Sequence, residues 1–470
     1  MKNSNKFRRL NNRFTITAAF VAILGLSGCD DDDPVVVEPP PPPPPPVTFT
    51  PFERIATLDV VTDGGAIDYG ATYSKVQDVA DAIHTYIETV NDVDVSGFPA
   101  NWIIGGSDED IDTIGDAILA IPSPDLIDPA EPASPANTYK VQVMDICNSY
   151  YAKKALGATN IIDGDDTSKV ANGFIHAPTL PCEVTVYNDA DNIYVDMLNP
   201  DAIFSLFFSD VVFGAQMDDA AFANEITTLP SLVKDELKTI VYAALDDASY
   251  TYTALSEKLG PEYTEDEILE AVDSSPYDSP YLHFSYMKTD AAVFTNAEVV
   301  AVAQTIINTM SISEEEGAGT HDDILDSLLS PGSGWRSARA TPLGLPGVGG
   351  FKNYIIEACS PKYAKEALGT GRHHAPALPC EISVTAIESS FGSGSFDTMV
   401  ISYLEPGFMF NALFKDGFES MTEEELVEYA ALPPTVLQDL QNIVNYSLGV
   451  DLDVTYSLTS SSRLTYDMMP

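Results

Sequence analysis

A long internal repeat is the feature of this 470-residue chain that most constrains its fold. The segment that starts at Tyr139, YKVQVMDICNSYYAKKALG, returns from Phe351 as FKNYIIEACSPKYAKEALG. Further along, HAPTLPCE from His176 returns as HAPALPCE from His374, and seven of these eight positions are identical. Because both copies carry the same pattern, the chain is expected to build the same supersecondary unit twice.

Each copy has the pattern of a small α+β unit. Asn148 or Ser360 is placed to cap a helix that follows a strand ending in cysteine, and Pro361 suits the first position of the second such helix. After the His-Ala-Pro turn, polar and apolar residues alternate, which predicts a strand with one buried face and one exposed face. The predicted strands lie near 55–61, 182–186 and 193–198 and near 282–287, 380–384 and 399–404, with helices over 76–87 and 299–310 and after Leu229-Pro230 and Leu432-Pro433.

The N-terminal residues have the pattern of an export signal. Basic residues precede a mostly apolar stretch, 14–28, that is too short to span a bilayer as a helix. The stretch ends in Leu26-Ser27-Gly28-Cys29, which resembles the bacterial lipobox, so Cys29 is expected to carry the lipid anchor. The alternative is an ordinary cleavable signal with a chance cysteine. We therefore expect a lipoprotein of the bacterial cell envelope, anchored to a membrane and facing the periplasm or the cell surface.

The predicted organisation has five parts. Eight prolines, 39–46, follow an acidic run and favour a stiff tether. The parts are a signal peptide (1–28), a tether (29–47), repeat 1 (48–272, core about 139–208), a linker (273–280) and repeat 2 (281–470, core about 351–414).

Composition excludes one class of partner. The chain has 71 Asp and Glu residues against 23 Lys and Arg, a formal net charge of -48. A surface of this sign repels phosphate backbones, so no nucleic-acid partner is expected. The chain is 45% hydrophobic, which supplies enough apolar material for buried cores.

Four segments of the first copy form a recognisable pattern: Ile146-Cys147-Asn148, the following Tyr151-Ala152, the strand from Leu180 to Tyr187, and Leu198-Asn199-Pro200. On these residues, the central stretch of each half resembles a bacterial family called domain of unknown function 302. The second copy departs from the pattern at Ala358-Cys359-Ser360 and Leu404-Glu405-Pro406. The resemblance implies two tandem copies of a small α+β domain with an antiparallel sheet, of the TATA-binding-protein-like type. Since such domains are often dimeric, the two copies are expected to form a pseudo-dimer within one chain.

Four cysteines remain after Cys29, two in each copy. An even number in an exported protein suggests disulfides, and the repeat selects Cys147–Cys182 and Cys359–Cys380. The alternative is a metal or thiol-redox site. His176 and His374 each precede the second cysteine of their copy, so each Cys-His-Cys set, completed by Asp145 or Glu357, suits zinc or copper. In the redox variant, Cys147 and Cys359 open helices, whose dipoles favour the thiolate.

Two functions stay open on the sequence. The first is a binding or structural module without a cofactor that recruits an envelope protein or a small ligand. The second is the metal or thiol-redox protein that uses the repeated cysteines and histidines. The chain has no phosphate-binding loop, no nucleophile elbow and no H-E-x-x-H motif, so the sequence gives no grounds for an enzyme class.

Overall fold

The chain was analysed as a computed structural model. The structure describes residues 48–92, 102–104, 140–156, 173–180, 182–189, 191–212, 220–274, 280–288, 293–310, 329–331, 333–342, 352–378, 380–387, 396–418, 421–450 and 456–460. The predicted signal peptide, Cys29, the proline tether and most of the predicted linker lie outside these residues.

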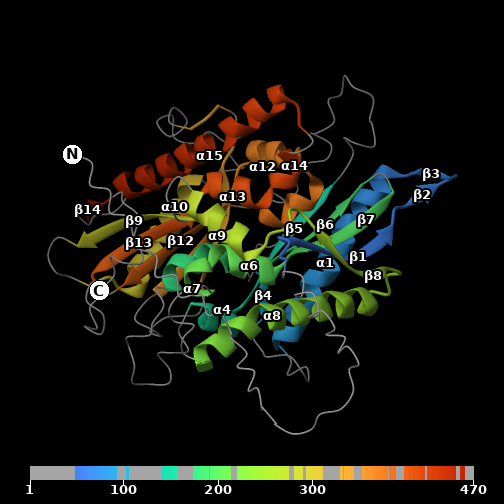
Figure 1. Ribbon diagram of the computed structural model, residues 1–470, viewed down its shortest axis with the longest axis horizontal. Coiled ribbons are helices and arrows are strands. Elements are labelled where there is room, and N and C mark those ends of the chain that lie inside the picture. Colours follow the sequence, from blue (N-terminus) through green and yellow to red (C-terminus); the bar gives the residue numbers. More distant parts are fainter. Residues whose placement is uncertain are drawn as a thin grey trace, which may run out of the picture. The chain divides into compact units, whose positions relative to one another are not determined.

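Two six-stranded antiparallel sheets with the same strand order form the centre of the fold (Figure 1). The first has the order β4-β5-β6-β7-β1-β8 and the second has β10-β11-β12-β13-β9-β14. The strands of the first sheet are β1 (Phe52–Asp59), β4 (Trp102–Ile104), β5 (Val141–Asn148), β6 (Cys182–Asn188), β7 (Asn192–Leu198) and β8 (Thr253–Leu259). The strands of the second sheet are β9 (Tyr281–Lys288), β10 (Arg336–Pro342), β11 (Lys352–Cys359), β12 (Cys380–Ile387), β13 (Thr398–Leu404) and β14 (Tyr456–Ser460). A short ribbon of β2 (Thr62–Asp63) and β3 (Ala66–Ile67) follows β1.

Long helices cover one face of each sheet. In Figure 1, α1 (Tyr69–Asp92) and α8 (Ala220–Asp247) lie along the first sheet, and α10 (Asn296–Met310) and α15 (Glu423–Val450) lie along the second. The shorter helices are α4 (Ser149–Ala155), α6 (Pro200–Phe207), α7 (Ser209–Val212), α9 (Glu265–Ser274), α12 (Pro361–Leu368), α13 (Pro406–Leu413) and α14 (Lys415–Phe418), with 3-10 turns η2 (Gly173–Thr179) and η5 (Arg372–Ala377). The fold class is α+β, as predicted.

Local sequence signals account for several helix starts. The Asn148 side chain accepts a hydrogen bond from the backbone N–H of Tyr151 at 3.3 Å, and the Ser360 hydroxyl accepts one from Tyr363 at 3.4 Å. Both predicted caps are therefore confirmed. The two C-terminal helices begin earlier than predicted, because α8 runs through Pro230 and α15 runs through Pro433 and Pro434.

The sheets are buried on both faces, which corrects the prediction of half-exposed strands. In β6 the apolar Val184 and Val186 face the helices, yet Glu183 and Thr185 on the other face are also buried. The second face is covered because repeat 2 packs against it. A separate small cluster joins Val141, Val143 and Tyr187 of the first sheet to Cys359, Ala364, Leu368 and Ala375 of the second repeat.

The His-Ala-Pro turns are exchanged across this interface. Turn η2 of repeat 1 contacts β9, β11, β12 and β13, and turn η5 of repeat 2 contacts β1, β5, β6 and β7. His176 packs edge-on against Tyr281, while His374 packs against Phe52, which holds the same position at the start of β1 that Tyr281 holds in β9. The turn recurs in both copies because each copy uses it to hold the other.

In the part of the chain that the structure describes, no helix has both the length and the apolar character that a membrane crossing requires.

Candidate ligand-binding pockets

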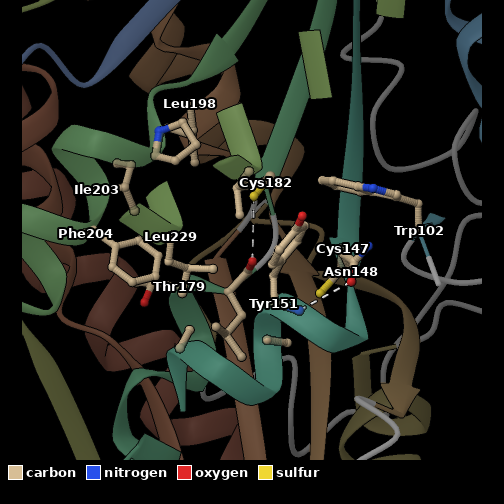
Figure 2. A pocket seen from close by; sticks show the side chains of 15 residues that line it. Trp102, Cys147, Asn148, Tyr151, Thr179, Cys182, Leu198, Ile203, Phe204 and Leu229 are labelled. Carbon is tan, nitrogen blue, oxygen red and sulfur yellow. Dashed lines mark hydrogen bonds between the residues drawn. The ribbon is translucent and has the colours of Figure 1, made fainter. Parts of the chain in front are cut away.

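An apolar pocket lies between the first sheet and the helices of repeat 1 (Figure 2). It encloses about 520 Å³ of space, part of it open to solvent. In Figure 2, Leu198, Ile203, Phe204 and Leu229 lie on one side, and Trp102, Tyr151 and Cys147 lie on the other. The remaining wall residues are Asn148, Ala152, Ala155, Thr179, Leu180, Cys182, Pro200 and Val233. The lining, which is mostly aliphatic and aromatic, suits contact with a largely apolar molecule.

A tryptophan, a tyrosine and a carboxylate fix one wall of this pocket. Trp102 is fully buried, and its indole N–H donates a hydrogen bond of 3.2 Å to Glu236 on α8. The Tyr151 hydroxyl donates to the other oxygen of Glu236, and the two rings meet edge to face with centroids 6.1 Å apart. The three side chains come from β4, α4 and α8, so they tie the sheet edge to the covering helix.

The same pocket recurs in repeat 2 on equivalent residues. It encloses about 440 Å³, with part of that space open to solvent. Trp335 donates to Asp439 at 2.9 Å, and the Tyr363 hydroxyl donates to the same oxygen at 2.9 Å. The wall residues are Trp335, Cys359, Ser360, Tyr363, Ala364, Ala367, Ala377, Leu378, Cys380, Pro406, Met409, Phe410, Phe414 and Val436. Both the cavity and its tryptophan-tyrosine-carboxylate wall are therefore duplicated.

The predicted disulfides are not formed, because all four cysteines are free thiols. The strand register explains this result. Cys182 stands directly opposite Ile146, one residue before Cys147, and Cys380 stands opposite Ala358, one residue before Cys359. The two cysteines of each copy are therefore offset by one residue in the strand register instead of directly paired, although both line the same pocket.

Burial also argues against the predicted thiolate chemistry. It raises the pKa of the Cys147 thiol to about 12, in spite of the helix that follows it. It raises the pKa of the Cys380 thiol to about 12 as well, and the pKa of Cys182 well above its ordinary value. These thiols are protonated at neutral pH and act as small apolar wall residues.

Thiol counting tests this description directly. In a Cys29→Ser chain, denaturation without a reductant should release four thiols to an alkylating reagent. In the native state Cys147 and Cys359, each 4% exposed, should stay unmodified while Cys182 and Cys380 react slowly. Intact mass before and after denaturation measures both numbers, and four thiols that appear only after reduction would contradict the structure.

The predicted Cys-His-Cys metal sets are not assembled either. The ligand atoms of Cys147, His176 and Cys182 do not come within 4.8 Å of one another, nor do those of Cys359, His374 and Cys380. His176 stacks on Phe208 with ring centroids 4.3 Å apart. The possible fourth ligands, Asp145 and Glu357, lie on the inner faces of the sheets instead.

His374 belongs to a different set of contacts, in repeat 2. Its Nδ1 is 2.6 Å from the Thr370 hydroxyl, and its Nε2 is 3.0 Å from Asp416. His373 reaches the other oxygen of Asp416 at 2.8 Å. Burial lowers the pKa of His374 to about 4, while the two imidazoles hold the pKa of Asp416 below its usual range. His374 is therefore a neutral ring at physiological pH.

The predicted site residues Cys147 and Cys182 line the first pocket, and Cys359 and Cys380 line the second, but the sequence motifs did not point to the tryptophans or carboxylates of the wall. The chain has two tryptophans, and the structure places one in each repeat at the same position. That distribution was the available signal. The carboxylates Glu236 and Asp439 carried no local signal, because each lies more than 70 residues along the chain from the rings it binds.

Comparison with known proteins adds little. No family model matches the chain, and no curated protein matches it. Among solved structures, the crystal structure of an uncharacterized conserved protein DUF302 from Bacillus stearothermophilus is similar at 16% identity, covering 33% of this chain and 97% of that chain with a TM-score of 0.17. A TM-score this low does not establish a common fold, and the likeness gives no function.

Proposed function

We propose that this protein is a lipid-anchored module of the bacterial cell envelope that binds small apolar molecules, one in each repeat. The main support for this proposal is that each repeat contains an apolar pocket at the same place in its fold. Trp102, Tyr151 and Val233 line the first pocket, and Trp335, Tyr363 and Val436 line the second at equivalent places. The resemblance of each half to domain of unknown function 302 supports a tandem origin for the two pockets.

The chemistry of the pockets favours apolar ligands with few polar atoms. Aliphatic and aromatic side chains make most of each wall, and the thiols are held protonated by burial. The hydroxyls of Tyr151 and Tyr363 donate to the half-buried Glu236 and the buried Asp439, so they position the wall rather than attack a substrate. Binding without covalent chemistry is the function that this lining supports.

The N-terminal lipid anchor and the proline-rich tether form the second part of the proposed function. Cys29 would hold the protein at a membrane through its lipid, and the proline run 39–46 would keep the two repeats clear of the surface. This arrangement suits a carrier or sensor of apolar molecules in the envelope, because such ligands partition into membranes. Globomycin should block processing at Cys29, and unchanged mass and processing would remove this part of the proposal.

Filling each pocket tests the binding function. Val233 and Val436 are buried wall residues on α8 and α15, so Val233→Trp and Val436→Trp should each occupy one cavity. With the neutral fluorophore N-phenyl-1-naphthylamine, the wild-type chain should bind two molecules. Each variant should bind one, and the double variant should lose at least about tenfold in affinity, the effect of about 1.4 kcal/mol.

Val427→Trp is the matched control, because Val427 lies on α15 but is 71% exposed. It should bind two molecules like the wild type. If the double variant keeps its circular dichroism spectrum and still binds the dye as the wild type does, the pockets are not the binding sites.

A further inference from the structure

Four carboxyl groups meet where the inner faces of the two sheets approach each other. Asp145 and Glu183 stand directly opposite each other on β5 and β6, and Glu357 and Glu381 stand opposite each other on β11 and β12. The second pair is the internal repeat of the first, and all four residues are at most 6% exposed. Like charges opposite each other in a sheet are destabilising, so the duplicated arrangement needs a physical explanation.

Carboxyl oxygens of Asp145, Glu183 and Glu381 are buried without a hydrogen-bond partner among the residues that the structure describes. Both carboxyl oxygens of Glu381 and Oε2 of Glu183 are buried without a partner among the described residues. Asp145 lies against Glu357, an interaction that needs a proton or a cation between the two carboxyls. Neither Glu183 nor Glu381 forms an ion pair with a described residue. Buried, unpaired carboxyl oxygens cost several kcal/mol unless something neutralises them.

The oxygens are close enough to bind one ion together. One carboxyl oxygen from each of Asp145, Glu183 and Glu381 lies within 4.8 Å of the other two. That separation lets three oxygens sit around a cation at ligand distances of about 2.0–2.6 Å. Because the three residues come from both repeats, an ion here would also join the two sheets.

A cavity leads to the cluster. Glu183 and Glu381 both line a space of about 340 Å³, partly open to solvent, between the two repeats. Its other walls include Pro178 of η2 and Ala377 of η5, the two exchanged turns. The carboxyls are therefore buried from bulk water and yet adjoin a route for a small ion.

We propose that Asp145, Glu183 and Glu381 bind a hard divalent cation, of the class of Mn²⁺, Mg²⁺ and Ca²⁺, between the inner faces of the two sheets. Carboxylate oxygens without thiolate or imidazole ligands select this class over zinc and copper. Two negative charges would be neutralised by the ion, and Glu357 beside Asp145 would complete the shell or retain its proton. The apolar pockets lie on the helical side of each sheet, and none of the three carboxyl residues lines them.

The test is a Mn²⁺ titration of the full chain after chelator treatment, followed by electron paramagnetic resonance at pH 7 in high salt, which suppresses weak surface binding. One Mn²⁺ per chain should bind, and the melting temperature should rise. Glu381→Gln and Glu183→Gln each replace one ligand and should weaken binding at least about tenfold, since even outer-shell changes cost 10–100-fold. Mg²⁺ and Ca²⁺ should displace Mn²⁺.

Glu405→Gln is the matched control, because Glu405 is 3% exposed but caps α13 away from the cluster. It should bind Mn²⁺ like the wild type. A wild-type chain that binds no stoichiometric Mn²⁺, Mg²⁺ or Ca²⁺ at millimolar concentration would overturn the proposal even if the variants failed to fold. So would Gln variants that fold and bind Mn²⁺ unchanged.

Discussion

Replacing Trp335 with alanine should lower the free energy of unfolding by about 3–5 kcal/mol, the range for large aromatic residues deleted from a core. The side chain is 1% exposed, and it holds three elements together. Its indole N–H donates to Asp439 on α15, and its ring meets Tyr363 of α12 edge to face with centroids 5.8 Å apart. Its removal would open a cavity beside the second apolar pocket.

The buried carboxylate of Asp439 makes this site sensitive. Its two oxygens accept hydrogen bonds from Trp335, Tyr363 and both the backbone N–H and the hydroxyl of Ser330. Trp335→Phe keeps most of the ring and removes one of these donors, so it should cost only about 1 kcal/mol. Urea unfolding followed by circular dichroism measures both variants without relying on the lost fluorophore. Equal losses in the two would show that the hydrogen bond, rather than packing, dominates.

Acid should destabilise the protein through His374. The folded pKa of His374 is lowered to about 4 by burial, while the unfolded value is 6.5. Between these values the unfolded chain binds more protons than the folded chain, so the free energy of unfolding falls as the pH falls. For this ring alone the loss between pH 7 and pH 5 is about 2 kcal/mol.

A variant separates the contribution of His374 to the pH dependence of stability from that of the other titrating groups. The raised pKa values of the buried Asp145, Glu183 and Glu381 act in the opposite sense, because those carboxyls bind protons more tightly in the folded chain. Comparing wild type with His374→Gln in chelator cancels their contribution. The variant should be less stable at pH 7, since Thr370 and Asp416 lose a partner, but its stability should fall by about 2 kcal/mol less between pH 7 and pH 5. If the free energy of unfolding changed with pH in the same way in both proteins, His374 would not be neutral in the folded chain.

Local pattern accounts for most of the predicted fold. Helical spacing places α1 and α10 correctly because Val76, Val79 and Ile83, and their counterparts in the second copy, all reach the core. The alternation of polar and apolar residues predicts strands β6 and β12 correctly, but it does not indicate what covers the second face of these strands. Thr185 and Glu183 were interpreted as solvent-facing polar residues, whereas they face the other repeat. Polar residues on one face of a strand are compatible both with exposure to water and with burial in a polar interface, so the sequence pattern does not separate the two.

The site was less predictable because its geometry depends on register and on distant residues. The two cysteines of each copy lie on adjacent strands, as predicted, but they are offset by one residue in the register and all four thiols are free. Asp145 and Glu357 were considered as companions of the cysteines, and the structure places them with Glu183 and Glu381 instead. The sequence repeats these acidic residues in both copies, with Asp145 or Glu357 two residues before the first cysteine and Glu183 or Glu381 directly after the second. Their meaning depends on burial, which the sequence did not show.

Joining the two repeats in one chain has a consequence for how the protein can change. In a symmetric homodimer every substitution appears twice around the axis, so an asymmetric contact cannot be built. Here Arg54 pairs with Asp196 and Tyr187 in repeat 1, while His373 with Asp416 occupies repeat 2, beside the exchanged turn. Because the two repeats are joined in one chain, a charged residue can be substituted in one repeat without changing the other. The two similar pockets can therefore evolve to bind different ligands while the repeats stay together.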